Sequence, residues 1–146
     1  MKMKKLICVM ALVCIGMLLV SCGSKRLDNP KAQFIRDFGL NIEKKDCVLE
    51  ELFNNYEGVP YEGIALYKLT IGEDVRQAFL QWERFPFSEE AEHFLESLSA
   101  YVELPLIADG YWKMVDRNPG TSAYTNVSLC VYDRATGAAY LLTMDI

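Results

Sequence analysis

Apart from its acids, this chain has few residues suited to acid–base or metal chemistry. The single histidine, His93, has Glu89 one helical turn before it and Glu96 nearly one turn after it. That spacing could present metal ligands on a helix, but it is also typical of a solvated acidic face. The solvated face is the favoured interpretation, so we expect no metal, no cofactor and no catalytic histidine.

Familiar catalytic motifs are also missing from the sequence. It contains no G-x-S-x-G, no H-E-x-x-H, no glycine-rich phosphate loop and no C-x-x-C. A hydrolase that uses paired carboxylates needs only two acids held in a cleft. The chain has 20 acids, and the sequence does not single out a pair.

Cys47 and Cys130 lie 83 positions apart, each in a segment that predicts a strand. A disulfide between them would close a long loop and contribute about 4 kcal/mol in the chain-entropy model. The alternative is two separate buried thiols that pack as small hydrophobic side chains. Both alternatives stay open, and the second is favoured.

A third cysteine, Cys22, follows a segment with the features of an export signal. Three lysines within the first five residues precede 15 uncharged residues, 6–20. As a helix these would span about 22 Å, short of the ~30 Å hydrocarbon core of a bilayer. Residues 1–21 therefore predict a signal peptide rather than a permanent transmembrane helix.

The four residues Leu19-Val20-Ser21-Cys22 resemble the lipobox of bacterial lipoproteins. The resemblance implies that the Cys22 thiol, a soft nucleophile as its thiolate, accepts a diacylglyceryl group. Cleavage before Cys22 would leave residues 22–28 as a lipidated tether. The protein would then sit at the cell membrane or outer membrane, held by acyl chains such as palmitate, with its domain outside the cytoplasm.

The rest of the chain, with "FIRDFGLNIEKKDCVLEEL" and "YDRATGAAYLLTMDI", resembles small uncharacterised bacterial lipoproteins in general. This likeness implies no site residues. A recognition loop is suggested instead by the tripeptide Tyr-Glu-Gly, which begins at Tyr56 and again at Tyr61. Tyrosines on a turn offer rigid contact area to a partner. The alternative is that both rings pack on the sheet edge.

Hydrophobic spacing predicts the elements around these residues. Helices are expected to begin at Asn29-Pro30, at Glu73 and after Ser88, ending near Gly39, Pro86 and Pro105. Strands are expected over 47–53, 63–71, 110–116, 126–133 and 138–145. Strands at both ends with helices between them predict one α+β domain over 29–146: an antiparallel sheet of about five strands with helices packed on one face.

Composition narrows the function classes. Beyond residue 21 the chain has 12 basic and 20 acidic residues, a net charge of −8, together with all 17 aromatic residues. This excess of acids argues against nucleic acid as a partner, and the aromatics argue for a packed core. The sequence favours a lipid-anchored binding module for an envelope protein, peptide or glycan. A small envelope hydrolase with paired carboxylates is the alternative.

Overall fold

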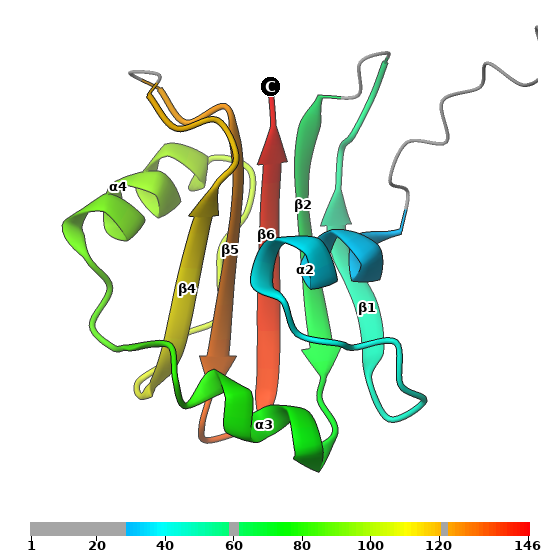
Figure 1. Ribbon diagram of the computed structural model, residues 1–146. Coiled ribbons are helices and arrows are strands. Elements are labelled where there is room, and N and C mark those ends of the chain that lie inside the picture. The colour runs from blue at the N-terminus through cyan, green and yellow to red at the C-terminus, as the bar shows by residue number, and fades with distance from the viewer. Residues whose placement is uncertain (1–28, 59–61, 121–122) are drawn as a thin grey trace, which may run out of the picture. The chain divides into compact units, whose positions relative to one another are not determined.

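The computed structural model describes residues 29–58, 62–120 and 123–146. A six-stranded sheet runs through residues 31–146 in the order β1-β2-β6-β5-β4-β3, and each pair of neighbouring strands is antiparallel (Figure 1). The strands are β1 (Val48–Asn54), β2 (Gly63–Thr70), β3 (Glu83–Arg84), β4 (Gly110–Asp116), β5 (Asn126–Asp133) and β6 (Ala138–Asp145). The helices are α2 (Pro30–Phe38), α3 (Glu73–Phe79) and α4 (Glu89–Leu98).

The predicted α+β class is confirmed, but the sheet has six strands rather than five. Each of the five predicted strands is present within about one residue of its predicted ends. The sixth, β3, pairs with Tyr111 and Trp112 of β4. It occupies a segment where we expected the second helix to continue toward Pro86, whereas α3 ends at Phe79. A strand of two residues is too short to show alternation in the sequence.

The expectation that the helices pack on one face of the sheet is wrong, because helices cover both faces. Successive side chains of a strand point to opposite faces, and seven of the eight residues of β5 are buried. Cys130 and Tyr132 contribute to a core with α2 and α3, whereas Leu129 and Val131 contribute to a core with α4. Figure 1 views the sheet with α2 in front of it.

We name the two cores by the helices that close them. The α2/α3-side core includes Phe34, Phe38, Val75, Phe79, Tyr67, Cys130 and Leu141. The α4-side core includes Ala91, Phe94, Leu98, Trp112, Leu129, Tyr140 and Leu142. Burial on both faces explains why β5 and β6 consist of nearly continuous apolar residues rather than alternating ones.

Local signals place the start of α4, the end of α2 and the β5–β6 turn where the sequence predicted them, whereas α4 ends at Leu98 rather than near Pro105. The Ser88 hydroxyl accepts the backbone N–H of Ala91 at 3.2 Å and so caps α4. Gly39 follows α2 with φ +73°, and Gly137 turns the β5–β6 hairpin with φ +69°. Both angles lie in the left-handed region that favours glycine. The Ser88 cap and the Gly137 turn fix where α4 and β6 begin, which positions the residues described next.

Candidate functional site

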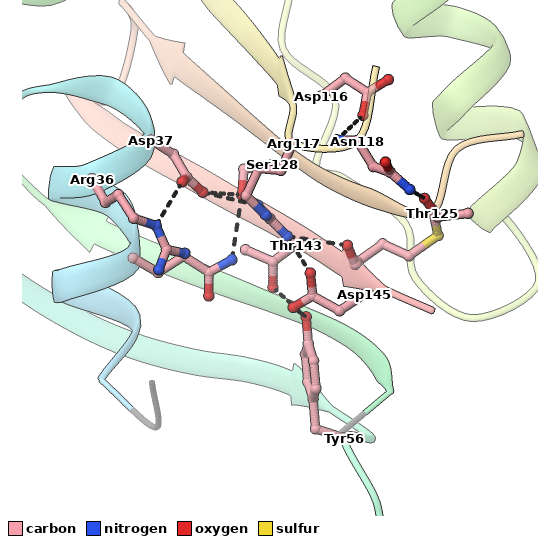
Figure 2. A network of polar contacts seen from close by, with 12 residues as sticks. Arg36, Asp37, Tyr56, Asp116, Arg117, Asn118, Thr125, Ser128, Thr143 and Asp145 are labelled. Atoms are coloured by element: carbon pink, nitrogen blue, oxygen red, sulfur yellow. Dashed lines mark hydrogen bonds and ion pairs between the residues drawn. The ribbon is translucent and has the colours of Figure 1, made fainter. Parts of the chain in front are cut away.

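A partly buried polar network lies at one end of the α2/α3-side core (Figure 2). Its centre is Arg117, which follows β4. The Arg117 guanidinium donates through Nη1 to Asp37 of α2, at 2.8 Å, and to Ser128 of β5. Through Nη2 it donates to the carboxylate of Asp145 on β6 and, at 3.3 Å, to the backbone carbonyl of Met144. One cation therefore joins α2 to two central strands.

Tyr56, in the connection between β1 and β2, extends this network. Its hydroxyl lies 2.9 Å from the Asp145 carboxylate and 3.2 Å from the Thr143 hydroxyl. Burial, more than the charge of Asp145, raises the pKa of the Tyr56 hydroxyl, which therefore stays protonated and donates to Asp145. We use the term Arg117 network for Asp37, Tyr56, Arg117, Ser128, Thr143 and Asp145.

The Arg117 network links α2 to the sheet and is partly accessible to solvent. The Asp37 side chain is only 3% exposed, and Arg117 offsets its charge. The side chain of Asp145 is 20% exposed and lies between Gly63 and Asn126 in the strand register. Asp145 thus belongs both to the Arg117 network and to the surface at this end of the sheet.

An open cleft of about 1480 Å³ lies at that end of the sheet, on the α4 side. Four segments converge on it: the β1–β2 connection, α4 and the residues after it, the β4–β5 connection, and the end of β6. The residues that line it include Glu57, Glu62, Ile64, Glu90, His93, Leu98, Tyr101, Asp116, Tyr124, Met144 and Asp145.

The cleft is strongly acidic. Five carboxylates line it, and no lysine or arginine is among the described residues of its wall. Asp145 is compensated by Arg117, whereas Glu57, Glu62 and Glu90 take part in no ion pair within residues 29–58, 62–120 and 123–146. Concave walls lined by charge of one sign focus the field and raise the local concentration of oppositely charged ligands.

Two tyrosines add aromatic surface to the cleft. Tyr124 packs edge-on against Phe94, with ring centroids 5.6 Å apart. The centroid of the His93 ring lies 6.2 Å from that of Tyr124. Loss of hydration raises the pKa of the Tyr124 hydroxyl, and the charges of Glu90 and Asp116 raise it further. Tyr101 is exposed. The acids and aromatic rings together can bind a ligand that carries positive charge.

Some of the residues singled out in the sequence lie in the Arg117 network or the cleft, and others lie outside the described residues. Tyr56 lies in the Arg117 network, with its hydroxyl turned to the sheet, while Tyr61 and Cys22 lie outside the described residues. His93 lines the cleft. Within the described part of the chain, no group of three or more His, Cys, Asp or Glu side chains is arranged to hold a metal ion. The carboxylate hydrolase stays a prediction, since the structure shows where acids gather but not a reacting pair.

For the aromatic residues around Pro86, the sequence favours core packing over an exposed aromatic clamp, and in the structure they pack against the two cores. Trp82 lies against Phe79 of the α2/α3-side core, with ring centroids 4.5 Å apart. Phe87 lies 5.6 Å from Trp112 in the α4-side core and 4.5 Å from Phe85. These contacts agree with the core-packing interpretation of this segment.

Cys47 and Cys130 are both free and buried, and both belong to the α2/α3-side core. We expect neither thiol of the native protein to react with N-ethylmaleimide, because both are shielded and burial raises the pKa of the Cys130 thiol. After unfolding in urea without reductant, both should be alkylated. Peptide mass spectrometry distinguishes these cysteines from the other three. A peptide pair linked through positions 47 and 130 would contradict this expectation and restore the disulfide.

Arg117, Asp37 and Asp145 could not be recognised as a group from the sequence. The composition of residues 117–122 predicts a turn, yet Arg117 continues β4, and its backbone N–H donates to the Asn126 carbonyl at 2.8 Å. A usable signal was Asp37, which stands between Phe34 and Phe38 on the apolar side of the first predicted helix. A carboxylate at such a position requires a buried partner.

Comparison of the chain with protein-family models, with curated proteins and with solved structures gave no match. The class of the molecule is therefore defined by its own geometry. It is an α+β domain with an antiparallel sheet, helices on both faces and an acidic cleft at one end of the central strands.

Proposed function

We propose that this protein is a lipid-anchored binding module of the cell envelope and that the cleft beside Asp145 is its binding site. The observation that carries this proposal is the convergence of four chain segments on one open, aromatic-lined cleft. Concave sites with a few polar groups and aromatic walls are the usual places for ligand recognition. The Arg117 network supports this use of the cleft, because it holds the end of β6 in place beneath it.

A photo-cross-linking residue placed in the cleft tests this proposal. Benzoylphenylalanine at Tyr101, which lines the cleft and is 58% exposed, is expected to form a discrete adduct on illumination of intact cells. The matched control position is Leu106, which is fully exposed and outside the cleft lining. Equal adducts from both positions, or none from Tyr101, would contradict a binding role for the cleft.

The anchor part of the proposal rests on residues 1–22, which lie outside the described residues. Within the described residues, no helix is both long and apolar enough to span a bilayer. If Cys22 carries the lipid, Cys22→Ser should abolish labelling by radioactive palmitate and release the protein from the membrane pellet. Cys47→Ser is the control, because Cys47 is buried in the core and should not affect labelling. Persistent labelling of the Cys22 variant would disprove the anchor.

A further inference from the structure

We propose that the cleft recognises a peptide segment that carries both basic and apolar side chains. This inference rests on the binding function proposed above and specifies the ligand class. Three features of the cleft support it: the sign of its charge, the apolar side chains in its wall, and an unfavourable pair of like charges at its rim.

The charge of the cleft selects a basic ligand. Glu57 and Glu62 come from the β1–β2 connection, Glu90 from α4 and Asp116 from the end of β4, so the acids surround the space. The Asp116 carboxylate accepts the backbone N–H of Asn118 at 2.8 Å and is held in position. A lysine or arginine side chain entering from solvent would meet carboxylates from three elements.

The apolar wall selects a peptide over a simple polyamine. Ile64, Leu98 and Met144 line the cleft but belong to the α4-side core and are at most 7% exposed. The apolar surface that the cleft presents to solvent includes Tyr101 and Ile146, which are 58% and 65% exposed. A ligand that carried only charge would leave this apolar surface in water, whereas a peptide with apolar side chains would bury it.

The strongest single feature is the Glu57–Glu62 pair. The backbone N–H of each residue donates to the carbonyl of the other at 3.0 Å, so the two residues face each other across an isolated β-bridge. Side chains of such an antiparallel pair project from the same face, and like charges directly opposite each other are destabilising. A cation bound between the two carboxylates would relieve this repulsion, so the free cleft already favours a basic partner.

Binding of three labelled hexapeptides to the full chain in detergent tests the inference. The probe is Leu-Lys repeated three times, and the comparison peptides are Leu-Glu and Gly-Lys repeats of equal length. We expect fluorescence anisotropy to show binding of the Leu-Lys peptide alone. The double variant Glu62→Gln/Glu90→Gln should weaken that binding by about tenfold or more. The matched variant Glu50→Gln/Glu92→Gln removes one exposed acid from the same hairpin and one from the same helix, outside the cleft, and should leave it unchanged.

Each of the other possible results would contradict a specific part of the inference. Equal weakening by the two double variants would mean that the overall charge, rather than the cleft, binds the peptide. Binding of the Gly-Lys peptide at equal strength would remove the apolar requirement, and binding of the Leu-Glu peptide or of no peptide would overturn the ligand class. If the cross-linker at Tyr101 still captures a partner in cells in those cases, the proposed function stands and only this inference fails.

Discussion

Replacing Arg117 with methionine is expected to destabilise the fold by about 3–5 kcal/mol. Methionine keeps much of the length of the side chain but removes the cation, which leaves Asp37 buried without a compensating charge. Removing one partner of a buried ion pair has a cost of this size because the remaining charge stays desolvated. Urea unfolding, followed by the fluorescence of Trp82 and Trp112, measures the change in the free energy of unfolding.

The matched control is Arg84→Met. Arg84 also pairs with an aspartate, Asp109 at 3.4 Å, but both side chains are largely exposed, at 63% and 45%. Exposed pairs of this kind contribute about 0–1 kcal/mol. Adding Asp37→Asn to the Arg117 variant should recover part of the lost stability. Equal effects at positions 117 and 84 would show that the network contributes no more than a surface pair.

Truncation of one phenylalanine in each core should show that both faces of the sheet are needed. Phe79→Ala in the α2/α3-side core and Phe94→Ala in the α4-side core are each expected to cost about 3–5 kcal/mol, because both rings are fully buried. If helices covered only one face, as the sequence suggested, one of these variants would be nearly neutral. Thermal and urea unfolding of the two variants measure the difference.

Leu106→Ala provides the control for these truncations, since Leu106 is fully exposed. We expect a change in the free energy of unfolding within about 0.5 kcal/mol for this variant. A small effect of either phenylalanine variant, comparable to that of Leu106→Ala, would contradict the two-core arrangement.

Much of the fold could be predicted from local patterns in the sequence. Ser88 and Gly39 gave the ends of two helices, and the Asn126–Asp133 and Ala138–Asp145 segments gave a hairpin, because caps and turns depend on neighbouring residues. The helix arrangement was harder to predict from these signals. The nearly continuous apolar runs of β5 and β6 are a sequence signal of burial on both faces, and the expectation of helices on one face, which was based on the grouping of strands, did not use it.

The candidate site could not be predicted for a different reason. Arg117, Asp37 and Asp145 are separated by up to 108 positions in the chain, and only the strand order brings them together. Nothing in the sequence distinguishes the acidic residues that line the cleft from the rest of the chain's 20 acidic residues. What distinguishes Glu57 and Glu62 is that they face each other across a β-bridge, which depends on the path of the intervening turn.

The position of β6 has a consequence for how the chain folds as it is made. β6 is the last strand in the chain, yet it lies between β2 and β5 and pairs with both along nearly its whole length. Until residues 138–145 have been synthesised, the β1–β2 and β4–β5 hairpins are two half-sheets with open edges and no strand to join them. Strand pairing between segments that are distant in the chain is slow, and exposed strand edges can pair with other chains or bind chaperones. The complete sheet of this protein therefore forms only after synthesis has passed Asp145, a delay that suits the export proposed above.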